Sequence, residues 1–278
     1  MGTLARLIKL EFKHLFSRKE FYYTFSIMII LSASAFLIFC GELYGRDISE
    51  LYPANQIWMS FSHYTNMISG LLYFFLLPIV ASVPFSDTFY CDKSCGVYKV
   101  IFTRYERKLY VFAKGIVVVI SAFFIIFIPL LANQLLSFLI SPFKSPINIT
   151  NLPSYIPIRT NGMLFPELYK SNPYIYNFVF MLIPSGVGSV LALVSYAVSF
   201  YVKKSRLLVV AIPAVVYILY NFLSSLLLSP KYALAYYLLP KSHSNLLGLE
   251  YPVFIMSGIT ILSVLAIIIR NFVVRDEI

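Results

Sequence analysis

The sequence predicts an all-α, polytopic membrane protein whose residues 1–278 form a single transmembrane domain with six spanning helices. Hydrophobic residues make up 59% of the chain and charged residues only 12%, about half the charged share of an average soluble domain. The apolar residues also occur in long runs, and about 20 such residues in a helix cross the hydrocarbon core of a bilayer. Lipid is therefore the expected solvent for most of the chain.

Six apolar runs are long enough to span a membrane. They comprise residues 21–40, 62–85, 115–140, 174–201, 207–228 and 252–270. The first run is too long for a cleavable signal peptide and follows a basic segment, so we expect it to remain in the chain as a span.

Residues 1–20 have the pattern of an amphipathic helix. The apolar stripe consists of Leu4, Ile8, Phe12 and Leu15, with Leu7 and Phe16 beside it. Arg6, Lys9 and Lys13 fall on the opposite side of the same helix. This arrangement is typical of a helix that lies in the membrane interface, and a plain basic tail that only sets the topology is the alternative.

The distribution of Lys and Arg predicts the orientation of the spans. Sixteen of the 22 lie in the N-terminal segment, the second and fourth connections and the C-terminus. The other six are Arg46, Lys144, Arg159, Lys170, Lys231 and Lys241. Because cytoplasmic loops carry the excess of these residues, both termini are expected in the cytoplasm. Anionic membrane lipids and a cytoplasmic partner are the expected counter-charges, and nucleic acid is not.

The connector between the second and third spans, residues 86–114, is long for a plain turn. It mixes aromatic and basic side chains, and Val97, Val100 and Ile101 share one helical face. Aromatic residues and Arg are enriched where proteins meet, so the connector is a candidate docking segment. A solvated, positively charged loop is the equally weighted alternative. Cys91 and Cys95 have the wrong spacing for a zinc site, so no metal is expected.

The predicted spans lack the groups that energise transport or catalysis. No Asp, Glu, Lys, Arg or His falls in the middle of any of them, and no Gly-Lys-Ser/Thr sequence for nucleotide binding is present. We therefore expect neither ion coupling nor enzymatic activity in this chain, and no cofactor bound to it. Any energy for uphill movement would come from a partner.

Polar side chains inside the spans have two interpretations. The candidates are Asn66, Asn133, Gln134, Asn221, Ser224 and Ser225. An amide that faced lipid would lack partners, so these side chains either line a pathway or bond to neighbouring helices. The Gly and Ser residues at 185–189 favour close helix packing.

Two connections on the expected outer side are unusual. Residues 141–173 hold six of the fifteen prolines and are expected to be irregular. Residues 229–251 are too apolar for an ordinary loop, and a short helix that re-enters the outer leaflet and ends at Pro240 is expected there.

The order of these elements resembles the ABC-2-type permease family, the membrane subunits of exporter-class ABC transporters. The resemblance covers the interfacial helix, the connector, the basic turn between the fourth and fifth spans, and the apolar segment before the sixth. Within the connector, Gly96 stands at the family's Gly, Val97 replaces its Thr, and Arg107 stands at its Arg. Lys114-Gly115 inverts the family's usual Gly-Lys.

The resemblance implies a mechanism and partners. The connector would form a coupling helix in a cleft of a separate ATP-binding subunit, with a second contact at the basic turn. The implied contact residues are Asp92, Lys93, Gly96, Val97, Tyr98, Lys99, Arg104, Arg107, Lys203, Lys204 and Arg206. Two permease chains, identical or homologous, would pair with two ATPases that bind ATP and magnesium.

The resemblance also implies a location and a cargo. The chain would export a hydrophobic or amphipathic peptide, drug or lipid across a bacterial plasma membrane. Two other classes stay open. One is a non-transporting sensor or scaffold that binds a ligand at its Pro-rich outer loop. The other is a membrane-embedded lipid-modifying enzyme.

Overall fold

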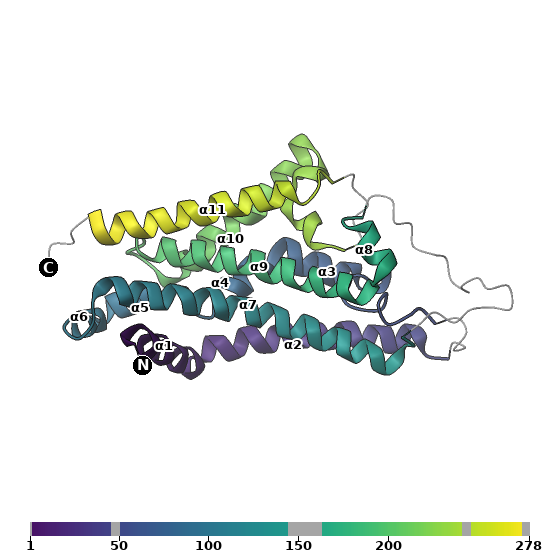
Figure 1. Cartoon of the computed structure of the whole chain (residues 1–278), viewed down its shortest axis with the longest axis horizontal. Helices are drawn as coiled ribbons and strands as arrows, with labels where there is room; N and C mark the ends of the chain where they lie inside the picture. The colour runs from purple at the N-terminus through teal and green to yellow at the C-terminus, as the bar shows by residue number, and fades with distance from the viewer. Residues whose placement is uncertain (1, 46–50, 144–162, 241–245, 274–278) are drawn as a thin grey trace.

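The computed structural model describes residues 2–45, 51–143, 163–240 and 246–273. About 80% of the chain is helical, and the described residues contain no strand. The long helices run side by side along the longest axis of the molecule (Figure 1). Within the described residues, six helical segments are long and apolar enough to cross a membrane, so the chain is a multi-pass membrane protein, as predicted.

The six segments coincide with the six predicted runs. The first is α2 (Lys19–Leu43), and the second runs through η2 (His63–Thr65), α3 (Asn66–Leu71), η3 (Leu72–Leu76) and α4 (Leu77–Ser82). The third is α7 (Arg107–Ile140) and the fourth is α9 (Pro173–Ser199). The fifth joins α10 (Arg206–Leu223) to η4 (Ser224–Leu228), and the sixth joins α11 (Glu250–Ile268) to η7 (Ile269–Val273).

The largest boundary difference is at the start of α7. Hydropathy placed the beginning of this span at residue 115, whereas the helix begins at Arg107. Residues 107–114 include neither Gly nor Pro, so nothing in them interrupts a helix, although their charges lower the hydropathy. At 1.5 Å per residue the 34 residues of α7 measure about 51 Å, longer than the roughly 30 Å hydrocarbon core. Part of α7 therefore extends beyond the hydrocarbon.

Helix α9 is the centre of the bundle and packs against α4, α7, α10 and α11. It lies close to α7 at Gly188, where a Cβ atom would lie 2.2 Å from Cδ1 of Ile126. One residue further on, the Ser189 hydroxyl donates to the carbonyl of Val119 at 3.1 Å. These contacts confirm close packing at this Gly and Ser cluster, since the missing side chain lets the two backbones approach.

Short elements lie at the two ends of the bundle. Helices α1 (Thr3–Ser17), α5 (Thr88–Ser94) and α6 (Val97–Phe102) lie at one end, which we call the connector end (Figure 1). Helix α8 (Pro166–Ser171) lies at the opposite end, as do the 3₁₀ turns η5 (Pro230–Tyr232) and η6 (Leu234–Leu238). Most of the Pro-rich segment, residues 144–162, lies outside the described part of the chain.

The apolar segment before the sixth span contains two short 3₁₀ helices, η5 and η6. Leu234, Tyr237 and Leu238 are buried, and the Asn221 side chain accepts a hydrogen bond from the backbone N–H of Ala235 at 2.8 Å. This segment is therefore packed into the protein. Its insertion into the outer leaflet stays a prediction.

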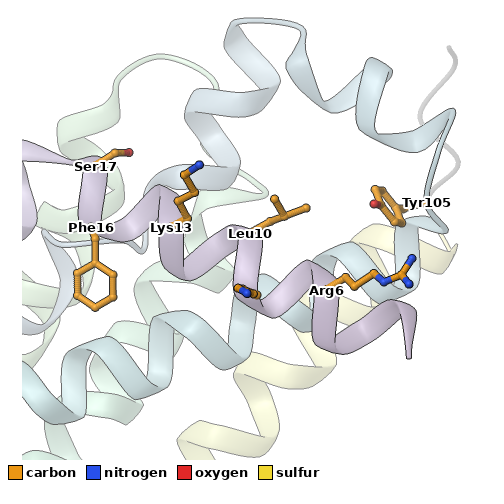
Figure 2. Close-up of a pocket in the computed structure, with 7 residues that line it drawn as sticks. Arg6, Leu10, Lys13, Phe16, Ser17 and Tyr105 are labelled. Atoms are coloured by element: carbon orange, nitrogen blue, oxygen red, sulfur yellow. The ribbon is translucent and has the colours of Figure 1, made fainter. Parts of the chain in front are cut away.

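Helix α1 has two different faces. Leu7, Glu11 and Leu15 are buried along one of them, at successive intervals of four residues. The opposite face exposes Arg6, Lys9 and Lys13 (Figure 2). The three basic residues lie on the exposed side of α1, and the buried line includes an acidic residue that the predicted apolar stripe did not include. That this helix lies in the membrane interface stays a prediction.

Candidate functional site

Charged and polar side chains gather at the connector end, and Glu11, Asp87, Asp92 and Lys114 among them are buried. They form two groups, which we call the Lys114 cluster and the Asp87 cluster. The Lys114 cluster consists of Glu11, His14, Asp92, Tyr110 and Lys114, and the Asp87 cluster consists of Arg18, Glu20, Asp87 and Arg206. Burying charge costs free energy unless the charges are paired. The nine side chains come from five segments of the chain, and the buried charges among them are paired with opposite charges.

Lys114 is completely enclosed, with 0% of its side chain exposed. Its Nζ lies 2.5 Å from Oδ2 of Asp92 and 3.1 Å from Oε2 of Glu11. The Tyr110 hydroxyl donates a second hydrogen bond to the Asp92 carboxylate, and the Lys114 ammonium lies 5.0 Å from the centre of the Tyr110 ring. This cluster joins α1, α5 and α7.

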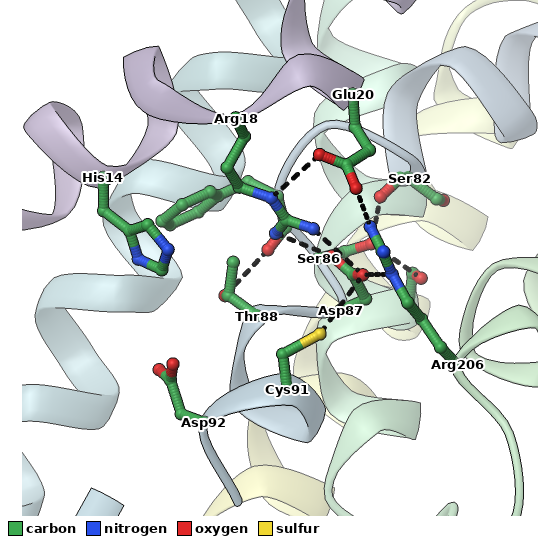
Figure 3. Close-up of polar contacts among 12 residues, drawn as sticks. His14, Arg18, Glu20, Ser82, Ser86, Asp87, Thr88, Cys91, Asp92 and Arg206 are labelled. Atoms are coloured by element: carbon green, nitrogen blue, oxygen red, sulfur yellow. Dashed lines mark hydrogen bonds and ion pairs between the residues drawn. The ribbon is translucent and has the colours of Figure 1, made fainter. Parts of the chain in front are cut away.

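Asp87 immediately precedes α5, and only 1% of its side chain is exposed. Arg18 approaches both of its carboxylate oxygens, with Nη1 2.8 Å from Oδ1 and Nη2 3.1 Å from Oδ2. Arg206 donates to the same carboxylate through Nε, and its Nη2 lies 2.5 Å from Oε1 of Glu20 (Figure 3). The result is a neutral group of two guanidinium and two carboxylate side chains.

The positions of the two arginines in the fold show which segments the Asp87 cluster connects. Arg18 is the single residue between α1 and α2, and Arg206 is the first residue of α10. Asp87 therefore links the connector to the start of the first span and to the start of the fifth. Together with the Lys114 cluster, these contacts join five helices, α1, α2, α5, α7 and α10, through charge-assisted hydrogen bonds, which are stronger than neutral ones.

His14 lies at the edge of the Lys114 cluster, with Nδ1 3.9 Å from Oε2 of Glu11. Burial, followed by the neighbouring Lys114 ammonium, lowers the pKa of His14 below its ordinary value of 6.5, against the opposing effect of Glu11. A protonated imidazole would place a second positive charge beside Lys114 in a poorly solvated site.

The lowered pKa of His14 predicts a pH dependence. The unfolded chain binds this proton more tightly than the folded protein does, so stability falls as pH drops below about 6.5. We expect the melting temperature to decrease between pH 7.5 and pH 5.5, and to decrease less in a His14→Gln variant. Thermal unfolding of both proteins in detergent across this range is the measurement. Equal decreases in the two proteins would show that His14 makes no such contribution.

The α5–α6 turn presents an apolar surface next to these clusters. Gly96 adopts a left-handed conformation with φ of 72°, which lets the chain reverse between the two short helices. Phe102 packs edge-on against Tyr110 with ring centres 5.7 Å apart and thereby anchors α6 to the Lys114 cluster. Val97 and Val100 stay 46% and 62% exposed on the other side of α6.

The structure separates the predicted contact residues into two sets. The positions that are exposed or half-exposed in this chain are Lys93, Val97, Tyr98, Arg104, Arg107, Lys203 and Lys204. The side chain of Lys99 lies outside the described residues. Asp92 differs from this expectation, because its carboxylate turns inward to Lys114 and Tyr110. Arg206 is half-exposed, but its guanidinium group bonds to Asp87 and Glu20.

The first group of predicted pathway residues bonds to segment 54–59. The Asn133 side chain accepts from the N–H of Met59 at 2.7 Å and donates to the carbonyl of Ser32 at 2.8 Å. Gln134 donates to the carbonyl of Ala54 at 3.0 Å. Its oxygen accepts from the Asn177 amide at 2.8 Å. Both side chains are buried, so within this chain they connect α7 to its neighbours.

The second group lies near the opposite end of the bundle from α6. Besides binding η6, Asn221 donates to the carbonyl of Tyr217 at 2.9 Å, and Ser224 donates to the carbonyl of Asn221 at 3.2 Å. The Ser225 hydroxyl is buried without a hydrogen-bond partner among the described residues. Asn66 is exposed, and its amide lies 3.4 Å from Nδ1 of His63.

Sequence reasoning did not single out Glu11, Arg18, Glu20 or Asp87. One signal was present for Glu11, because Leu7, Glu11 and Leu15 occupy one line at intervals of four residues on an otherwise apolar face. An acidic residue in such a line needs a buried cation as its partner.

Comparisons of the chain with protein-family models, with curated proteins and with solved structures found no match. Among the described residues, no group of three or more His, Cys, Asp or Glu side chains is arranged to hold a metal ion.

Proposed function

We propose that this chain is the permease subunit of an ATP-binding-cassette transporter, which exports a hydrophobic or amphipathic substrate with energy from a separate ATPase. The observation that supports this function best is the charge network at the connector end. It links the α5–α6 turn, on which a partner could act, to the first, third and fifth spans through Asp87 and Asp92.

The coupling would begin at the exposed face of α6. Val97 and Val100 supply an apolar contact, and Lys93, Tyr98, Lys99 and Arg104 supply charged and polar contacts around it. Lys203 and Lys204, which precede α10, supply the second contact. Asp92 and Arg206 act inside the chain, in our proposal, and transmit the movement of α5 and α6 to the spans.

Transmission would use two carboxylates of this segment, Asp87 directly before α5 and Asp92 within it. A displacement of α5 moves Asp87 and with it Arg18 and Arg206, at the starts of the first and fifth spans. The same displacement moves Asp92 and with it Lys114 on the third span. Packed and hydrogen-bonded connections of this kind can carry coupling between distant sites when the elements have two arrangements. ATP binding in the partner would then shift the inward–outward equilibrium of the bundle.

The proposed assembly contains two permease chains and two ATP-binding subunits, with ATP and magnesium held by the latter. The connector end faces the cytoplasm of a bacterial cell in this proposal, which agrees with the distribution of Lys and Arg. Helix α1 lies in the cytoplasmic interface of the plasma membrane, next to the first span.

Charge reversal on the proposed contact tests the coupling. We expect a Lys99→Glu and Arg104→Glu double variant to lose substrate-stimulated ATP hydrolysis by roughly tenfold or more, because like charges across an interface cost several kcal/mol. Membrane insertion should be unchanged. ATP hydrolysis by the complex reconstituted in lipid is the measurement.

A Lys170→Glu and Lys231→Glu variant is the matched control, since both residues lie at the opposite end of the bundle. This variant should keep stimulated hydrolysis. Full stimulation in the Lys99 and Arg104 variant would contradict the proposed contact.

A further inference from the structure

The exposed face of α1 borders an open hollow of about 830 Å³ at the connector end. Arg6, Lys9 and Lys13 lie along this hollow together with the exposed apolar side chains of Leu10 and Phe16. Figure 2 shows Tyr105, from the segment after α6, beyond the Arg6 side chain. The hollow thus combines cationic groups with an apolar surface.

The three cations have no anionic partner within the described part of the chain. Their spacing of three and four residues places them on one side of α1, where like charges repel one another. The acidic residue of the same helix, Glu11, lies on the opposite side and forms an ion pair with Lys114. An anion from outside the chain would therefore meet unopposed positive charge on this face.

The position of α1 relates this face to the membrane surface. Arg18 alone separates α1 from α2, the first candidate span, so α1 ends directly beside the start of that span. Helix α1 packs against α7 and bonds to it at Lys114, near the first residues of α7. Phospholipid headgroups occupy this level, and exposed apolar side chains there can meet the acyl chains below them.

We propose that the outer face of α1 is a binding site for an anionic phospholipid. The phosphate group would be held by Arg6, Lys9 and Lys13, and the upper part of the acyl chains would lie against Leu10 and Phe16. The site does not depend on the transport function proposed above. Glu11 lies on α1 and Arg18 directly follows it. A lipid bound to the outer face of α1 would therefore also influence the position of these two members of the charge network.

Photolabelling with a defined lipid tests this site. Purified protein in detergent is mixed with phosphatidylglycerol that carries a diazirine in one acyl chain, and the labelled peptides are mapped by mass spectrometry after illumination. We expect label to concentrate on residues 3–17 and to be displaced by unlabelled phosphatidylglycerol but not by phosphatidylcholine or by soluble glycerol phosphate.

Variants of matched charge complete the test. Each cation near an anionic headgroup strengthens binding by roughly fivefold, so Lys9→Gln with Lys13→Gln should reduce labelling of residues 3–17 by about tenfold or more. A Lys203→Gln and Lys204→Gln variant, which removes two charges from the same end, should label normally. Lys9→Arg with Lys13→Arg keeps the charges and should also label normally.

Three results would overturn the proposal. Equal displacement by phosphatidylcholine would mean that only the ordinary lipid surroundings were labelled. Displacement of the label by glycerol phosphate would show that the acyl chains do not contribute to binding. Unchanged labelling of the Gln variant would show that Lys9 and Lys13 do not hold the phosphate. If that variant did not elute as a folded protein, the lipid competition on the unsubstituted chain would decide.

Discussion

A Lys114→Met substitution is expected to destabilise the folded protein by about 3–5 kcal/mol, since removing one partner of a buried ion pair leaves the other charges uncompensated. The ammonium group is fully enclosed and touches both Asp92 and Glu11. Without it, two carboxylates would remain beside each other in a poorly solvated site. Chemical or thermal unfolding in detergent measures the loss, and a change below about 1 kcal/mol would contradict the geometry of the cluster.

Neutralising the whole cluster should recover most of the stability lost. A Glu11→Gln, Asp92→Asn and Lys114→Met triple variant contains no buried charge at these positions, and such replacements are often neutral in other proteins. If the triple variant were no more stable than Lys114→Met alone, the loss would come from packing of the lysine stem and not from unpaired charge.

An Asp87→Asn substitution is the second large effect that the structure predicts. The neutral amide cannot balance Arg18 and Arg206, so we expect a loss of about 2–4 kcal/mol. This is below the value for a fully enclosed pair because 43% of the Arg206 side chain is exposed and water can solvate it. The variant should also weaken the link between the connector and the first and fifth spans.

Protease sensitivity separates this local effect from general unfolding. In the Asp87→Asn variant, cleavage near Arg18 and in the turn at residues 200–205 should become faster than cleavage elsewhere. The matched control is Glu167→Gln, which removes the exposed ion pair between Glu167 and Lys170 and should change stability little. Identical cleavage patterns in the two variants would show that Asp87 does not hold these segments together.

The spans could be predicted because lipid imposes a simple requirement. A backbone in hydrocarbon must satisfy its own hydrogen bonds, so each long apolar run has to be a helix. The same criterion does not reach the start of α7, because residues 107–114 are helical but include the charged Arg107, Lys108 and Lys114. It could not give the type of helix around η6, which is a short 3₁₀ helix bonded to the Asn221 side chain.

The charge network could not be predicted in the same way. Asp87 meets Arg18 and Arg206, which are 69 and 119 positions away, and no periodicity relates such distant residues. Hydropathy identified the connector and the basic turn as separate polar segments. Only the packing of α1, α5 and α10 at one end of the bundle shows that their charges neutralise one another.

The most direct test of the proposed function is affinity purification of the tagged chain from its native membranes in mild detergent, with quantitative mass spectrometry of the proteins that co-elute. The account predicts a soluble ATP-binding subunit at one copy per chain, and its loss in the Lys99→Glu and Arg104→Glu variant. Absence of any ATP-binding protein, under conditions that keep other membrane complexes intact, would contradict the transporter function.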